Sequence, residues 1–218
     1  MQADLATSSP MTTPGPVGFD LDMTLIDSRP QILSSFRALS DETGVAIDLE
    51  VVEARLGLKL EDELEHWFTS TAVTNAAATY RRHYVTLAAT ETVALPGAHE
   101  ALRAVRVAGA SSVIVTAKHE SSVQPCLRCA GLEADAVYCF VHGPEKAEVL
   151  RRIGARVYVG DTPPDMTAGH SAGAFAVGVT TGSFDERELL DAGASVTIGS
   201  LEEFPACYRR WLASSSIP

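Results

Sequence analysis

The sequence has little basic charge and no long apolar run. It carries 17 Lys and Arg residues against 28 Asp and Glu residues, a formal net charge of −11 over 218 residues. The absence of a basic face argues against a nucleic-acid partner, and the acidic balance argues against an anionic membrane surface. The negative net charge does not exclude a small anionic substrate, because a metal ion and a few cationic side chains can make the local charge positive.

Signals for export or membrane insertion are also missing. No stretch reaches the roughly 18 apolar residues that a membrane span needs. Residues 1–16, MQADLATSSPMTTPGP, lack the basic start and apolar middle of a secretory signal. They are rich in Ser, Thr and Pro, so we expect a disordered tail there. We therefore expect a cytoplasmic protein without a membrane partner.

Cysteines are few: Cys126, Cys129, Cys139 and Cys207. The first two form a Cys-x-x-Cys pair, but a structural zinc site needs four ligands and no second pair exists. Val123, Leu127 and Ala130 recur around them at helical spacing, which favours small apolar residues on a helix. Free cysteines without an export signal again indicate a reducing, cytoplasmic setting.

What is present is a regular alternation of elements. A short apolar strand starts at residue 17, a region without strand character follows over 29–92, and strands then alternate with helices to the end. Such alternation predicts an α/β fold with a parallel sheet covered on both faces, and the region over 29–92 is expected to be an inserted helical cap. We expect the core over 17–28 and 93–218 and the cap over 29–92. Strands are expected within 111–118, 135–141, 155–161, 174–182 and 195–200, and helices within 29–44, 49–68, 77–90, 94–109, 119–132, 144–154, 164–173 and 185–193.

Four separate stretches place polar residues directly after predicted strands or at a helix start. In open α/β sheets, ligands bind at the carboxyl ends of the strands. An isolated Asp-x-Asp is more often a solvated turn, but four such stretches in one order are a strong signal. In chain order the residues are Asp20, Asp22, Thr116, Lys146, Asp161 and Asp165.

Other polar residues have simpler interpretations. Asp27 is expected to cap the helix that follows it. Lysine occurs only at positions 59, 118 and 146, so Lys118 is the alternative cation if Lys146 is a solvated helix residue. The histidines at 66, 119 and 142 lack an acid-and-nucleophile context and are expected at the surface or in the cap.

The segments FDLDMTLIDS, VIVTAK, Lys146 and GDTPPD resemble the four ordered motifs of the haloacid dehalogenase superfamily. The match extends over nearly the whole chain from Val17. It is closest to the phosphoglycolate-phosphatase-like branch, which has a helical cap after its first motif. Two departures are Met23, where Gly is usual, and the segment CFVHGPEK before the lysine.

The resemblance implies a Rossmann-like parallel sheet core with an inserted helical cap domain, Mg²⁺ dependence and phosphoryl transfer through an aspartyl phosphate. Asp20 would be the nucleophile, and Asp22 would protonate the leaving oxygen and then deprotonate the attacking water. Thr116 and the N–H of Ala117 would hold the phosphoryl oxygens, and Lys146 would offset their charge.

The same resemblance implies a metal site. Asp20, the backbone carbonyl of Asp22 and Asp161 would be ligands of Mg²⁺, which prefers oxygen donors. Asp165, four residues after Asp161, would be a further ligand or a neighbouring acid.

We favour a phosphatase acting on a small phosphorylated metabolite. A phosphomutase would use the same core residues, whereas a dehalogenase would need no acid at Asp22. A non-catalytic phosphate-binding regulator would not need the complete set of acids and lysine. The cap would select the substrate, with Arg55, Lys59 or His66 as candidates or as solvated residues; the substrate itself and the oligomeric state stay open.

Overall fold

The computed structural model describes residues 14–56 and 58–215, and its centre is a six-stranded parallel sheet. The predicted α/β fold class, a Rossmann-like parallel sheet covered by helices, is confirmed. In spatial order the strands are β5 (Ala136–Tyr138), β4 (Ser112–Val115), β1 (Val17–Phe19), β6 (Val157–Gly160), β7 (Phe175–Val179) and β8 (Val196–Ile198).

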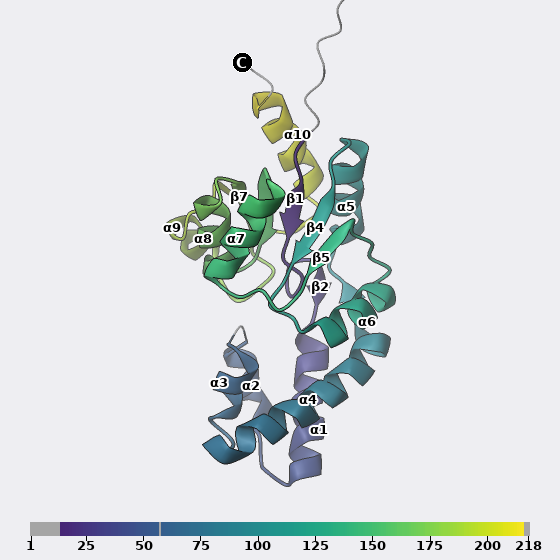
Figure 1. Cartoon of the computed structure of the whole chain (residues 1–218), viewed down its shortest axis with the longest axis vertical. Helices are drawn as coiled ribbons and strands as arrows, with labels where there is room; N and C mark the ends of the chain where they lie inside the picture. Colours follow the sequence, from purple (N-terminus) through teal and green to yellow (C-terminus); the bar gives the residue numbers. More distant parts are fainter. Residues whose placement is uncertain (1–13, 57, 216–218) are drawn as a thin grey trace, which may run out of the picture.

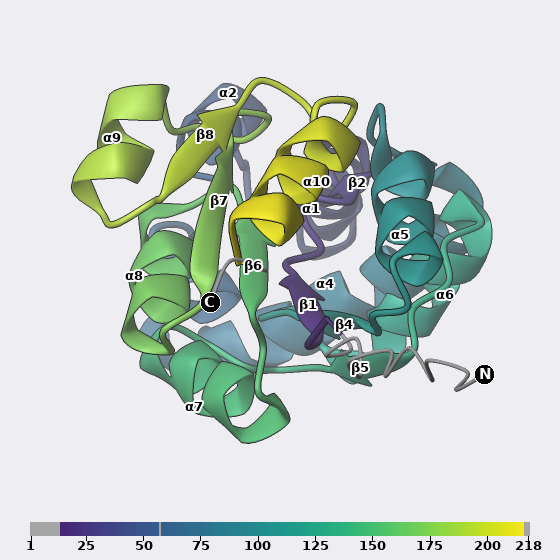
Figure 2. The same cartoon turned by 90° about the horizontal axis from the view of Figure 1, so that it is seen from above.

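Helices cover both faces of this sheet, as the view from above shows (Figure 2). One face carries α7 (Pro144–Ile153), α8 (Pro163–Ser171) and α9 (Glu186–Asp191), and the other carries α5 (Ala98–Val107), α6 (Glu120–Ala130) and α10 (Phe204–Ser215). Both faces of the central strands are therefore buried, which explains why Val17 to Phe19 and Val157 to Gly160 lack polar alternation.

The remaining helices gather at one end of the molecule (Figure 1). They are α1 (Arg29–Thr43), α2 (Leu49–Ala54), α3 (Leu60–Leu64) and α4 (Ser70–Glu91). The ring of Phe36 in α1 packs at a tilt against that of Tyr80 in α4, with a centroid distance of 4.7 Å, inside the apolar interior of this group. Two short strands, β2 (Ile26–Asp27) and β3 (Val93–Ala94), pair antiparallel where the chain leaves and re-enters the core. The boundaries of core and cap stay predictions.

Several expected elements differ in detail. The single helix expected over 49–68 is two short helices, α2 and α3, and α4 begins at Ser70 rather than at residue 77. β5 ends at Tyr138 instead of 141, because Phe140 has a left-handed backbone (φ 58°) that a strand cannot accommodate.

Two further expectations concern Asp27, expected to cap α1, and the N-terminal tail. Ser28 occupies the N-cap position of α1, but the Asp27 side chain still accepts from the N–H of Arg29, the first residue of the helix, at 3.1 Å and pairs with its guanidinium at 2.8 Å. Residues 1–13 of the expected tail lie outside the described residues, whereas the carbonyl of Pro16 accepts a hydrogen bond from Arg156 N. Among the helices of the described ranges, none is long and apolar enough to cross a membrane.

Candidate active site

Two neighbouring strands end in acids at the same edge of the sheet. Asp20 follows β1 and Asp161 follows β6, and these strands pair in parallel. The Asp20 N–H donates to the carbonyl of Val159 at 2.8 Å, which fixes the backbone at this point. One carboxylate oxygen each from Asp20, Asp161 and Asp165 lies within 4.8 Å of the others, and all three residues are buried. The strand-end acids predicted from the sequence are thus brought together.

Lys146 connects two of these acids. It lies in the first turn of α7, and its Nζ is 2.6 Å from Asp20 Oδ1 and 2.6 Å from Asp165 Oδ1. Burial lowers the pKa of Lys146, but the charges of Asp165 and Asp20 outweigh that effect and hold its pKa well above the ordinary value. The side chain therefore stays a cation in contact with Asp20.

Asp165 is held by several donors. Its Oδ1 accepts from Lys146 and lies 2.9 Å from the Tyr158 hydroxyl, and its Oδ2 accepts from the hydroxyl of Thr162, the N-cap of α8. A Cβ on Gly160 would lie 2.5 Å from the Asp165 Cβ, so this packing needs glycine there. Tyr158 was not predicted as a site residue, because a tyrosine inside an apolar strand is indistinguishable from ordinary core.

Asp161 has a different environment. Thr24, also missing from the predicted set, donates to Asp161 Oδ1 at 3.0 Å. Burial raises the pKa of Asp161 well above its ordinary range, and the charge of Asp20 adds to the effect. Burial likewise raises the pKa of Asp20 to about 7, although Lys146 opposes it.

This cluster fits a divalent cation. Three buried carboxylates lie together, and Lys146 pairs with two of them, Asp20 and Asp165. Buried charges are unfavourable unless paired or bound to a metal. The donor atoms are all oxygens, which is the set that Mg²⁺ prefers over softer metals. A Cβ on Gly182 would lie only 2.1 Å from Asp161 Oδ2, so the absence of a side chain there leaves that oxygen its space.

Asp22 has its own lysine. Lys118 Nζ lies 2.6 Å from Asp22 Oδ1 and 2.7 Å from the hydroxyl of Tyr84, a residue of α4. Lys118 was expected only as a substitute for Lys146, whereas the structure gives each lysine a different acid. Tyr84 was missed, because it lies on an amphipathic helix about 30 residues from the nearest motif in the sequence and nothing local distinguishes it.

Thr116 and Ala117 follow β4, the other neighbour of β1. Thr116 is buried, its Oγ1 accepts from the N–H of Lys118 at 3.1 Å, and Ala117 is exposed beside it. All predicted site residues therefore follow β1, β4 or β6 or begin the adjacent helix α7.

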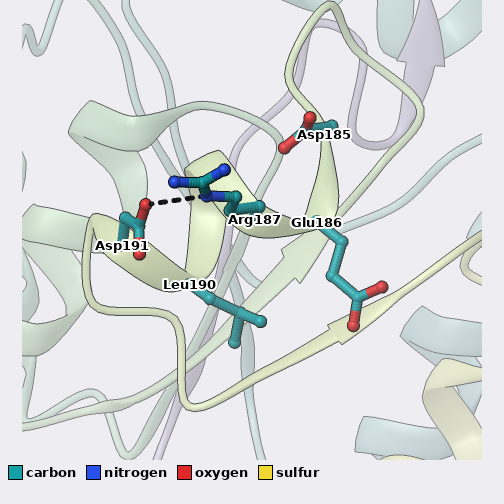
Figure 3. Close-up of a pocket in the computed structure, with 5 residues that line it drawn as sticks. All are labelled: Asp185, Glu186, Arg187, Leu190 and Asp191. Atoms are coloured by element: carbon teal, nitrogen blue, oxygen red, sulfur yellow. Dashed lines mark ion pairs between the residues drawn. The ribbon is translucent and has the colours of Figure 1, made fainter.

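The hollow on α9 does not belong to this site (Figure 3). Its lining includes Leu190, Asp185 and Glu186, together with an exposed ion pair between Arg187 and Asp191 at 3.7 Å. Exposed pairs of this kind contribute little free energy, and a six-residue helix offers no enclosed site.

The residues suggested for substrate selection are separated. Arg55 pairs with the buried Glu63 at 3.2 Å beside a small hollow within the helical group. His66 is exposed, and Lys59 acts electrostatically on His142 of the core. Cys126 and Cys129 both lie on α6, as predicted, and all four cysteines are free thiols.

Comparisons with known proteins agree with this geometry. The family model of haloacid dehalogenase-like hydrolases matches residues 17–179. A relative from Dickeya dadantii, named "Probable phosphatase IndB", is 29% identical, covering 92% of this chain and 96% of its own. A phosphoglycolate phosphatase from Nitrosospira multiformis is 26% identical, covering 86% of this chain and 92% of its own.

Solved structures share the fold. A haloacid dehalogenase-like hydrolase from Streptococcus pneumoniae has a TM-score of 0.77 at 21% identity, covering 93% of this chain and all of its own. A structure described as "putative beta-phosphoglucomutase from Thermotoga maritima" has a TM-score of 0.72 at 21% identity, covering 90% of this chain and 99% of its own. The resemblance inferred from the four motifs is confirmed: this chain belongs to the haloacid dehalogenase-like hydrolase family.

Proposed function

We propose that this haloacid dehalogenase-like phosphatase is Mg²⁺-dependent and hydrolyses a small phosphorylated metabolite through an aspartyl phosphate. The observation that carries the proposal is Lys146 Nζ, which lies 2.6 Å from both Asp20 and Asp165 next to Asp161. A carboxylate attacks a phosphate dianion only if the repulsion between them is neutralised, and this cluster supplies a fixed cation where the attack would occur.

In the first step, an oxygen of Asp20 forms a bond to phosphorus while the bond from phosphorus to the leaving oxygen breaks. Asp22 gives its proton to that oxygen, so the alcohol departs neutral. In the second step, water attacks phosphorus and Asp22 takes the proton back. The bond to Asp20 breaks, and inorganic phosphate and the free carboxylate result.

Other residues hold the phosphoryl group. Thr116, buried at the end of β4, and the N–H of Ala117 would donate hydrogen bonds to its oxygens, and Lys146 would balance their negative charge. Lys118, paired with Asp22, keeps a second cation beside the leaving oxygen.

Asp20, Asp161 and the backbone carbonyl of Asp22 would hold Mg²⁺, which supplies neutralisation of phosphoryl charge when bound. Asp165 was expected as a ligand or as a neighbouring acid. Its hydrogen bonds from Lys146, Tyr158 and Thr162 favour the second role, in which it orients Lys146.

The helical group over residues 29–92 is proposed as the cap that selects the substrate, joined to the core through β2 and β3. We also propose a cytoplasmic location, because four free thiols suit a reducing compartment.

The test is release of phosphate from p-nitrophenyl phosphate with Mg²⁺ or with EDTA. We expect hydrolysis only with Mg²⁺, and a loss of at least a thousandfold in Asp20→Asn, which keeps shape but cannot attack phosphorus. Asp27→Asn is the matched control, since Asp27 lies in the same segment and its carboxylate pairs with Arg29 rather than with a residue of the cluster. Hydrolysis by Asp20→Asn at near the original rate would overturn the assignment of the nucleophile.

A further inference from the structure

The segment after β5 contains a bulky residue in an unfavourable backbone conformation. Phe140 has a φ of 58°, in the left-handed region that favours glycine. The residue is 57% exposed, so burial of the ring does not compensate for the strain. Strain of this kind persists where the surrounding structure enforces it, and it gathers at functional sites.

Two backbone hydrogen bonds hold Phe140 beside the phosphoryl-binding segment. Its N–H donates to the carbonyl of Lys118 at 3.0 Å, and the N–H of Val141 donates to the carbonyl of Thr116 at 3.0 Å. The backbone of Phe140 therefore lies next to the segment proposed to hold the phosphoryl group, which ends at the lysine that pairs with Asp22.

Two imidazoles flank the ring. The centroid of Phe140 lies 5.7 Å from that of His119 and 4.9 Å from that of His142, with interplanar angles of 78° and 87°. Such edge-to-face contacts are favourable and fix the orientation of the rings. We call His119, Phe140 and His142 the aromatic rim.

The aromatic rim faces the helical group. Burial lowers the pKa of His142, and Lys59 adds to this, while Glu61 of α3 opposes it. The charges of Lys59 and Glu61, at the start of α3, are therefore near enough to His142 to change its pKa, and the lowered pKa favours the uncharged imidazole. The rim is thus an aromatic surface at the junction between the core and residues 29–92.

We propose that the aromatic rim binds the leaving group of the substrate, and that this group carries a planar, uncharged aromatic or heteroaromatic ring. The inference rests on the proposed phosphatase function and concerns the part of the substrate beyond the phosphate. A leaving oxygen protonated by Asp22 would lie near Lys118, whose Nζ pairs with Asp22, and the N–H of Phe140 donates to the backbone carbonyl of the same lysine. A planar ring there gains stacking on Phe140, which a saturated group of equal size does not.

The test compares benzyl phosphate with cyclohexylmethyl phosphate. Both release a primary alcohol of similar size, and only the first contains a planar ring. We expect kcat/KM to favour benzyl phosphate about fivefold, mainly through KM, as one aromatic contact provides. Phe140→Leu should reduce this preference to below twofold, and Phe140→Tyr should retain it. Leu keeps an apolar side chain and the same backbone requirement, so thermal unfolding should be little changed.

Val107→Ala is the control for loss of an exposed apolar side chain. Val107 is 82% exposed at the end of α5, which precedes β4 and so lies at the opposite edge of the sheet. The Val107→Ala variant should therefore keep the wild-type preference for benzyl phosphate. Three outcomes would overturn the inference without contradicting the proposed phosphatase function. They are equal kcat/KM for the two esters, a benzyl preference that is unchanged in Phe140→Leu, and hydrolysis of p-nitrophenyl phosphate but of neither ester. Absence of Mg²⁺-dependent hydrolysis of every ester would overturn the proposed function, and the inference with it.

Discussion

The hydroxyl of Tyr84 lies 2.7 Å from Nζ of Lys118, which pairs at 2.6 Å with Asp22. Tyr84 belongs to α4, so one side chain of the helical group reaches the proposed catalytic acid through a lysine of the core. The Lys118 ammonium also lies 4.4 Å from the Tyr84 ring centroid. Tyr84 therefore limits where Lys118 can lie, and through it where Asp22 can lie.

Removing the Tyr84 hydroxyl should affect proton transfer and little else. Tyr84→Phe keeps the ring, and we expect kcat/KM for an alkyl phosphate to fall about fivefold, the value of one hydrogen bond. For p-nitrophenyl phosphate, whose leaving group needs little protonation, the loss should stay below twofold. Tyr80→Phe, one turn earlier on α4, is the matched control in the same steady-state assays. An equal loss for both esters would show that Tyr84 does not act through Asp22.

Asp22→Asn should separate the two chemical steps. The amide keeps the shape of the side chain but cannot take a proton from water, so the second step slows more than the first. With p-nitrophenyl phosphate we expect a burst of p-nitrophenol and a phosphorylated chain. Acid quenching, digestion and mass spectrometry should find phosphate on the peptide that contains Asp20. Rapid turnover without a burst would contradict the double role of Asp22.

Met23→Gly should stabilise the protein. Met23 has a φ of 59°, and a left-handed backbone costs a residue with a Cβ roughly 1 kcal/mol. Glycine removes that strain but loses more entropy on folding. We therefore expect the free energy of unfolding to rise by about 0.5 kcal/mol, and Tm to rise by ~1–2 °C. Ala108→Gly is the control, because Ala108 has a φ of −74° and glycine there should lower Tm. A fall in Tm for Met23→Gly would show that the side chain contributes more than the strain costs.

Stabilisation by Mg²⁺ should depend on pH. The pKa of Asp20 is raised from 3.8 to about 7, so the folded state binds more protons than the unfolded state between these values. In EDTA, this group makes the free energy of unfolding fall as pH rises through that window, and the loss is complete above it. Mg²⁺ binds the ionised acids, so it should raise Tm more at pH 8 than at pH 5.5.

Scanning calorimetry of the wild type and of Asp20→Asn, each with Mg²⁺ and with EDTA, measures this dependence. The variant lacks the titrating group and should show a smaller difference between the two pH values. Equal Mg²⁺-induced shifts at both pH values in the wild type would contradict the assignment of Asp20 to the metal site.

The sequence by itself determined the order of elements and the identity of the strand-end acids. Buried parallel strands need continuous apolar runs, and such runs end where the chain turns, so Asp20 and Asp161 were visible as acids after strands. Short elements were predicted less well. The strands β2 and β3 have two residues each and no periodicity, and the helix expected over 49–68 is interrupted between α2 and α3.

Only the tertiary structure decided which lysine pairs with which acid. Lys118 and Lys146 lie 96 and 126 residues from their partners Asp22 and Asp20, and no local pattern encodes such pairings. Tyr84, Thr24 and Tyr158 resemble ordinary helix or core residues in the sequence, because a hydroxyl acquires its role only from the group it faces. The left-handed backbone of Phe140 likewise depends on its bonds to the neighbouring segment, since nothing in a phenylalanine side chain favours that conformation.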